Sequence, residues 1–335
     1  MSKYFSTITE MEGYKKRRSD EFYVSLKSDI PECIGNTILR SIMSSIQTYT
    51  IDPKSIVFHK NTSSWGNHIL QKQFEYIPLM YDIFDKKDIN MIEIELNITN
   101  KNIEYRYVKT GEMVVKNKEK DIILKNEDIF FANIPLFLIG YNEEVHMTCS
   151  LEYDSQKNTN SRHQASNCGM YFDDNTKEVR LSVSKQTGIS SKELVIKSIE
   201  SIVKRLQDLE QNITISNKSK VHIQINANRR FDFILIDDDY TIGSLIEAWN
   251  NTKLQDIVTG CKKSIDHKSI ILDFGVKGLD TKEKIDDVIK VFLKSLQDIH
   301  KYMNILLEDS KKINTKTIPI PTYMEKLKEF RKMVM

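Results

Sequence analysis

The apolar residues of the chain follow one pattern that occurs twice, and its first copy lies near the N-terminus. Phe22, Val24 and Leu26 alternate with polar residues, which is the spacing of a half-buried strand. A helix is expected next, because Pro31 suits a first helical turn, where no amide donor is needed. The apolar residues of this helix recur every four positions, at Ile34, Ile38, Ile42 and Ile46.

The second copy lies far downstream and has the same order. Phe231, Phe233 and Leu235 alternate as a strand would. Three aspartates at residues 237–239 then offer carboxylates that cap and stabilise a helix N-terminus. The apolar positions of the helix predicted after them are Ile242, Leu245, Ile246 and Trp249.

Both predicted helices open with an Ile-Gly pair, Ile34-Gly35 in the first copy and Ile242-Gly243 in the second. Glycine inside a helix costs about 1 kcal/mol relative to alanine. We therefore expect another backbone to pack closely against the helix at both glycines.

Each copy is completed by a further alternating segment and a long amphipathic helix. The first copy supplies Val179, Leu181 and Val183, then Leu194, Ile199, Ile202, Val203, Leu206 and Leu209. The second supplies Ile270, Leu272 and Phe274, then Ile285, Val288, Ile289, Phe292, Leu296, Ile299 and Met303. The first copy has many more residues between its two helices, which predicts an inserted domain.

The insert is predicted to be mostly β, since it contains several alternating segments and a Thr-Gly turn at residues 110–111. Its strand positions are Ile92, Ile94, Leu96 and Ile98, then Ile103, Tyr105 and Tyr107, then Val114 and Val115. Polar residues dominate 155–167, which indicates an exposed loop.

These elements predict an α+β protein with two pseudo-symmetric dimerisation domains, each a sheet with long amphipathic helices, and a mostly β insert in the first. The predicted divisions are an N-terminal extension (1–19), the first dimerisation domain (20–50 and 173–212), the insert (51–172), the second dimerisation domain (213–308) and a C-terminal tail (309–335). The residues predicted to join the two halves are Ile34, Gly35, Ile38, Ile42, Leu206, Ile242, Gly243, Leu245, Ile246, Trp249, Phe292 and Leu296.

Composition supports several hydrophobic cores and argues against a dedicated nucleic-acid binder. The chain has 335 residues, more than one core usually holds. Lys and Arg total 49 against 47 Asp and Glu, so the formal charge is only +2. This balance predicts that any contact with a nucleic acid is local.

The cysteines and the apolar runs predict a reduced, soluble protein. Cys33, Cys149, Cys168 and Cys261 are too scattered for a structural zinc site. The first ten residues are polar, so we expect no cleavable signal. The longest apolar run, 129–141, contains Asn133 and is shorter than the roughly 20 residues that span a bilayer.

Residues 34–79 resemble the signature region of the archaeal D-type and eukaryotic third-largest-type RNA polymerase subunits, which are relatives of the bacterial α subunit. The residues that match the family pattern are Asn36, Arg40, Ile51, Asp52, Asn61, Thr62, Ile77, Pro78 and Leu79. The family has a His-Arg-Leu-Gly-Leu run before the last motif, where this chain has Lys-Gln-Phe-Glu-Tyr at 72–76.

The later segments resemble the same family. Residues 185–206 look like its Thr-Gly turn and long dimerisation helix. Residues 237–246 resemble the L-type, or eleventh-subunit, signature, with Thr241 and Gly243 as the sharpest matches. Gly260, Lys262 and His267 are similar to a later segment of that subunit. Fused subunits of this kind are similar to those of large cytoplasmic DNA viruses.

The resemblance implies a non-catalytic platform that docks the largest and second-largest polymerase subunits and a small assembly subunit, and meets DNA and RNA only through that complex. It implies no cofactor and no metal, since the cysteine cluster of some D-type relatives is absent, and it requires no homodimer. The expected location is the cytoplasm, and also the virion if the source is a virus. The residues expected to dock partner subunits are Asn36, Arg40, Asn61, Thr62, Pro78 and His163.

Arg40 is a docking candidate on physical grounds as well. It lies two positions before Ile42 and so sits away from the apolar stripe. There its guanidinium is able to contact a partner's carboxylates or carbonyls through two nitrogens. By resemblance, that partner is the second-largest subunit. The alternative is a solvated arginine.

Other interpretations of the polar residues stay open. The aspartates at 237–239 suit Mg²⁺ as well as a helix cap. Cys149, His163 and Cys168 include metal-binding residue types, but they leave a fourth ligand unnamed. No Walker-type loop and no Ser/His/Asp arrangement occurs at recognisable spacing.

Two other classes of function compete with the polymerase platform. The basic run at 15–18 and the Lys-rich tail suit an independent nucleic-acid-binding or interaction protein, although runs this short are often solvated extensions. A metal-dependent hydrolase built on the aspartates or on His163 is the third class. The balanced charge disfavours the nucleic-acid-binding protein, and the lack of a nucleophile disfavours the hydrolase.

Overall fold

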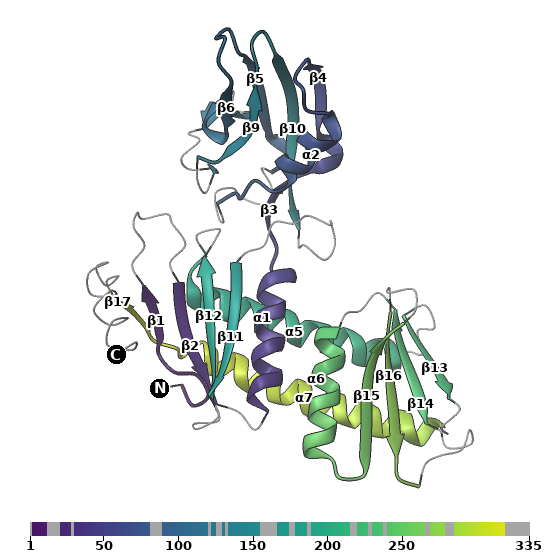
Figure 1. The fold of residues 1–335 in the computed structure, drawn as a ribbon. Coiled ribbons are helices and arrows are strands. Elements are labelled where there is room, and N and C mark those ends of the chain that lie inside the picture. Colours follow the sequence, from purple (N-terminus) through teal and green to yellow (C-terminus); the bar gives the residue numbers. More distant parts are fainter. Residues whose placement is uncertain are drawn as a thin grey trace, which may run out of the picture.

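The computed structural model describes residues 2–11, 21–27, 30–80, 89–119, 122–124, 129–130, 133–154, 166–173, 178–185, 189–214, 220–226, 230–236, 240–264, 269–278 and 285–318. The predicted α+β class is confirmed, because antiparallel sheets and helices occupy separate segments. Figure 1 shows a mostly β insert above two halves that lie side by side. Within the described residues no helix is both long and apolar enough to cross a membrane.

The first half is a five-stranded sheet with two helices. In spatial order its strands are β11 (Ser166–Asp173), β12 (Glu178–Lys185), β2 (Glu21–Leu26), β1 (Ile8–Met11) and β17 (Thr315–Ile318). Its helices are α1 (Pro31–Ser44) and α5 (Ser191–Thr214). The alternating residues Val24 and Leu26 are buried, as are Val179 and Leu181 opposite them, so the strands pack one face against the helices.

The second half has a four-stranded sheet and two helices in the same arrangement. In spatial order its strands are β15 (Ile257–Lys263), β16 (Ser269–Val276), β14 (Phe231–Ile236) and β13 (Val221–Ile225). Its helices are α6 (Tyr240–Lys253) and α7 (Ile285–Ser310). The order β15, β16, β14, β13 therefore corresponds to β11, β12, β2, β1 in the first half.

The helical glycines occupy matching positions in the two halves. A Cβ on Gly35 of α1 would lie 2.7 Å from Val179 Cγ1 and 3.0 Å from Met170 Sδ. A Cβ on Gly243 of α6 would meet Cys261 Sγ and lie 2.8 Å from Ile270 Cδ1. The sequence led us to expect a backbone at these points. The neighbours are instead sheet side chains, because each helix lies directly on its own sheet.

The insert is formed by residues between α1 and β11. Its main sheet has the order β3, β10, β5, β7 and β8, with β4 also paired to β10, and β6 and β9 form a separate pair. The insert strands are β3 (Thr48–Ile51), β4 (Val57–Asn61), β5 (Ile92–Thr99), β6 (Arg106–Lys109), β7 (Val114–Asn117), β8 (Ile122–Leu124), β9 (Pro135–Ile139) and β10 (Glu144–Asp154). It also contains one helix, α2 (Asn67–Glu75), which was not predicted from the sequence.

The sheets divide the chain at different points from those expected. Thr48–Ile51 pairs with β10 in the insert, and Ser166–Asp173 pairs with β12 in the first half. Ile8–Met11, in the expected N-terminal extension, pairs with β2. Thr315–Ile318, in the expected tail, runs parallel to β1. The two strands on one side of the first half's sheet, β1 and the edge strand β17, therefore come from opposite ends of the chain.

A buried carboxylate ties the N-terminal segment to α7. Asp309, only 5% exposed, accepts hydrogen bonds from Ser2 Oγ at 2.6 Å, Lys3 N at 2.8 Å and Tyr4 N at 2.7 Å. Burial alone would raise the pKa of Asp309, but these hydrogen bonds outweigh it and hold the pKa below its ordinary value. With β17, this clasp fastens the end of the second half to the first.

Adding a methyl group at either helical glycine should destabilise the protein. Gly35→Ala and Gly243→Ala gain about 1 kcal/mol in helix propensity. The overpacking against the sheet costs about 1–3 kcal/mol and should exceed that gain. Gly169→Ala is the control, because its Cβ would meet nothing within 4 Å. Denaturant unfolding measures all three, and equal midpoints for the three variants would contradict the packing assigned to the glycines.

Removing the charge of Asp309 should weaken the clasp. Asp309→Asn should cost about 1–3 kcal/mol near pH 7, because hydrogen bonds to a buried charge are lost. A depressed folded-state pKa stabilises the protein above the unfolded pKa of about 3.9, and this contribution disappears as pH falls through the folded value. The difference from wild type should thus shrink below about pH 4. Glu308→Gln, an exposed neighbour, should show no such difference in chemical unfolding.

Candidate docking groove and the interface between the halves

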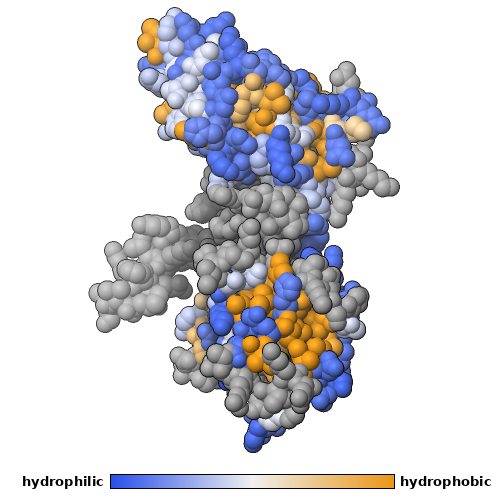
Figure 2. Space-filling model, turned by 90° about the vertical axis from the view of Figure 1, so that its right-hand side faces the viewer, coloured by the Kyte–Doolittle hydropathy of each residue, from blue (hydrophilic) through white to orange (hydrophobic). Residues whose placement is uncertain are grey.

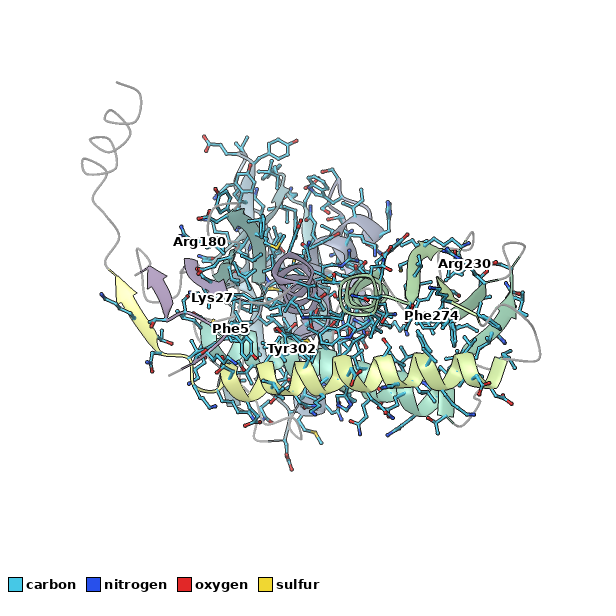
Figure 3. The ribbon with its side chains drawn as sticks, turned by 90° about the horizontal axis from the view of Figure 1, so that it is seen from below. Phe5, Lys27, Arg180, Arg230, Phe274 and Tyr302 are labelled. Carbon is cyan, nitrogen blue, oxygen red and sulfur yellow. The ribbon has the colours of Figure 1, made fainter. Side chains whose placement is uncertain are left out.

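The residues predicted to join the halves lie in one hydrophobic cluster that includes side chains from both sheets. Its members include the predicted residues Ile34, Ile38, Ile42, Leu206, Ile242, Leu245, Ile246, Trp249, Phe292 and Leu296. The long helix α5 packs along α7, and α1 packs against α6. Figure 3 shows α7 running beneath both halves. The two halves therefore share a single core.

Aromatic rings fix α7 against the sheet of the second half. Phe292 stacks on Phe233 with centroids 4.1 Å apart and meets Phe274 edge-on at 5.1 Å. At the other side of the core, Trp249 of α6 lies 5.2 Å from Tyr302 of α7, between ring centroids. Contacts of this kind are directional, so they set the position of α7 as well as burying it.

A groove of about 580 Å³ lies between α1 and α6, where the two halves meet. Glu32, Asn36 and Arg40 follow one another along α1 at four-residue spacing on the groove side. Tyr240 and Ser244 contribute from α6. Most of these side chains are polar and at least partly exposed, so the groove suits contacts to polar groups of another chain.

Arg40 connects the two halves and still presents charge to solvent. Its Nε donates to Thr241 Oγ1 of α6 at 3.1 Å. The side chain is exposed, and Asn36 lies one turn before it on the same face. This hydrogen bond holds the guanidinium of Arg40 against α6 beside the groove. Of the predicted docking residues, the structure brings Asn36 and Arg40 together here.

Asn61 and Thr62 lie elsewhere, in the insert, where they build a turn between β4 and α2. Asn61 Nδ2 donates to Trp65 O at 2.8 Å, and its Oδ1 accepts from Ser63 Oγ at 2.7 Å. Thr62 Oγ1 accepts from Glu144 N at 2.8 Å. Their polar atoms are thus engaged in holding the turn. Pro78 is half-buried next to Leu79, and His163 lies outside the described residues.

Charged side chains on the outer face of the insert sheet pair with one another. Lys116 Nζ lies 2.6 Å from Glu95 Oε2, and His146 Nε2 lies 3.2 Å from Glu95 Oε1. The hydrogen bond from Lys116 holds the pKa of Glu95 below its ordinary range, although burial opposes it. A similar pair joins Lys118 to Glu93 at 2.7 Å. These charges satisfy one another, so this face offers little to a charged partner.

The cysteines and acids show no metal centre in the described ranges, where no cluster of three ligands forms. Burial raises the pKa of the Cys33 thiol to about 11, and Sγ donates to Ser244 O at 3.4 Å. Burial also raises the pKa of Cys149. These thiols stay protonated near neutral pH. The aspartates at 237–239, the basic run at 15–18 and His267 lie outside the described residues.

Sequence reasoning missed the clasp at Asp309 and the link from Arg40 to Thr241. Thr241 was noted only as a motif match, and nothing local connects it with α1. No protein-family model matches the chain, and no curated protein matches it significantly in sequence.

Cys33 should react slowly while the groove is folded. At pH 7.5 a thiol with a pKa near 11 is less than about one part in a thousand thiolate, and the thiolate is the reacting form. Alkylation of Cys33 by iodoacetamide should accelerate about tenfold per pH unit between pH 7.5 and 9.5. Peptide mass spectrometry measures it, with Cys33→Ser as the control. Rapid labelling of the folded chain at pH 7.5 would contradict the burial of this thiol.

Proposed function

We propose that the chain is a non-catalytic assembly subunit of a DNA-directed RNA polymerase, with D-like and L-like halves fused in one polypeptide. The observation that carries the proposal is the matched pair of halves. Each has the same strand order and a short helix whose glycine lies on the sheet, and the long helices pair in one core. Two related domains joined in this way supply the obligatory heterodimer on which such a platform is built.

The groove between α1 and α6 supports a docking role in this platform. Arg40 and Asn36 lie on its rim, and they belong to the segment that resembles the D-type signature. A guanidinium held by Thr241 is well placed to bind carboxylates or carbonyls of the second-largest subunit. The largest subunit and a small assembly subunit complete the proposed set of partners, and nucleic acid is met only through them.

In this proposal the chain performs no chemistry, and the nucleotidyl transfer belongs to the large subunits. The proposed location is the cytoplasm of a host cell, and also the virion if the source is a virus. The nucleic-acid-binding alternative needs the basic run at 15–18 and the Lys-rich part of the tail at 319–335. Both lie outside the described residues, so no observation on the groove favours this alternative.

Tagged chain isolated from its native source should bring down both large polymerase subunits in near-equal amounts. Arg40→Glu should reduce the recovery of the second-largest subunit by about tenfold or more, because a favourable charge at the groove becomes a repulsive one. Lys54→Glu, at an exposed site in the insert, is the matched control and should not reduce recovery.

The two possible failures of this experiment have different meanings. Wild-type chain that arrives without large polymerase subunits contradicts the proposed function. Wild-type and Arg40→Glu chains that recover the subunits equally leave the function standing but remove Arg40 from the docking site. Thermal unfolding of the variant shows whether any loss reflects misfolding, since its hydrogen bond to Thr241 is also removed.

A further inference from the structure

The sheet of the second half has one face without a helix. Phe233 and Leu272 point toward the helices and are fully buried, while alternate residues point away. On that outer face lie Ile234, Ile236 and Ile271, which are partly exposed, and Val258 on β15, which is 51% exposed. Figure 2 shows apolar side chains gathered on the end of the molecule that the second half forms. We call these four residues and their sheet surface the open face.

The matching face of the first half carries Ser25 and Arg180, with the exposed Tyr171 opposite Arg180, so the fold itself does not require an aliphatic face there. Val179 and Ile270 contact the helical glycine of their own halves, which makes the next residues, Arg180 and Ile271, equivalent. By the same register Ser25 corresponds to Ile234. Arg180 and Lys27 are labelled on the first half in Figure 3. The apolar character of the open face is therefore specific to the second half.

The charges around the open face favour an acidic partner. One row crosses the four strands in the order His222, Ile234, Ile271 and Lys262, so the isoleucines lie between basic residue types. Lys262, and Lys220 beside His222, are exposed, and neither forms an ion pair with the residues that the structure describes.

The acidic side chains that the structure describes on the open face already have hydrogen-bond partners. Asp232 accepts from Asn226 Nδ2 at 3.0 Å. Asp273 accepts from Asn226 Nδ2 at 3.1 Å and pairs with Arg230 NH1 at 3.1 Å. Among the residues that the structure describes on this face, the charged side chains with neither a hydrogen bond nor an ion pair are Lys220 and Lys262, and they flank an apolar centre.

We propose that the open face docks an amphipathic helix of another polypeptide, whose apolar stripe packs on Ile234, Ile236 and Ile271 and whose flanking acidic residues pair with Lys220 and Lys262. A helix with one apolar stripe is the element that normally covers a sheet face of this kind. The inference rests on the proposed function in one respect, because the helix is assigned to another chain of the same assembly.

Other occupants fit the open face less well. Two copies packed face to face would bring unpaired lysines together. A nucleic acid would find isoleucines where stacking requires aromatic rings. The chain's own segment 319–335 begins at β17, in the first half's sheet, whereas the open face lies toward the opposite end of α7 in Figure 1. A helix formed by that segment would be roughly 25 Å long, whereas α7, with 26 residues, is roughly 39 Å long. Such a helix would therefore be too short to span the length of α7 and cover the open face.

Photo-crosslinking in the purified native assembly tests this proposal. A benzophenone amino acid replaces Ile271, and the matched control carries it at Arg180, the equivalent position of the first half. Position 271 should crosslink to a segment of another chain that has apolar residues at three- and four-residue spacing and acidic residues beside them. Position 180 should yield at least about tenfold less of that product, because it lies between Ser25 and Tyr171 and has no isoleucine beside it on this face.

Each other outcome overturns the proposal. These outcomes are no intermolecular product at position 271, a crosslink to nucleic acid, or a crosslink to a segment that lacks this pattern. A product between two copies, recognised by mixing light and heavy isotope-labelled chains, would do the same. Co-purification of the large subunits is recorded on the same sample, so a failure of the proposed function is distinguished from a failure at the open face.

Charge reversal gives a second measurement. Lys220→Glu with Lys262→Glu should reduce retention of the crosslinked partner by about tenfold at moderate salt, the effect of losing two border ion pairs. Lys54→Glu with Lys101→Glu, at exposed insert positions, should leave retention unchanged. Equal retention by both double variants would remove the acidic character assigned to the helix.

Discussion

The packing of four helices and two sheets around one shared core is the constraint on which the rest of the molecule depends. Ile38 and Ile242, on helices of different halves, are fully buried in the same cluster, as are Leu206 and Phe292 on the two long helices. A half on its own would expose the stripe that the other half covers. Burying each such side chain contributes about 1.5–3 kcal/mol, so the association of the halves is part of folding itself. The groove between α1 and α6 exists only because of this association.

The sequence predicted those parts of the fold that leave a local record. Four-residue spacing in α1 and two-residue alternation in β2 and β14 reflect burial on one side of one element, which is visible in neighbouring residues. The neighbouring strands β1 and β17 leave no such record. Each is four residues long, and their pairing joins segments near opposite ends of the chain. Asp309 was missed for the same reason, since its partners lie at residues 2–4.

The candidate site was predicted to a similar extent. The position of Arg40 outside the apolar stripe is a property of one helix, so the sequence was able to place it on a surface. Its hydrogen bond to Thr241 depends on how two distant helices meet, which no local pattern encodes. The family resemblance predicted that Asn61 and Thr62, like Arg40, dock partner subunits. Their hydrogen bonds show that such a motif also contains residues that build a turn.

The two halves are alike inside and different outside, and packing explains the contrast. Gly35 and Gly243 must both stay small, because a helix lies on sheet side chains at each position. No such demand acts on the outer faces of the sheets. The first half carries Arg180 and a Lys27–Glu178 pair on its outer face and leads into the insert, whereas the second carries Ile271. A platform with identical faces would bind the same partner twice. In the proposed platform, outer faces that differ would let one pseudo-symmetric core bind different chains.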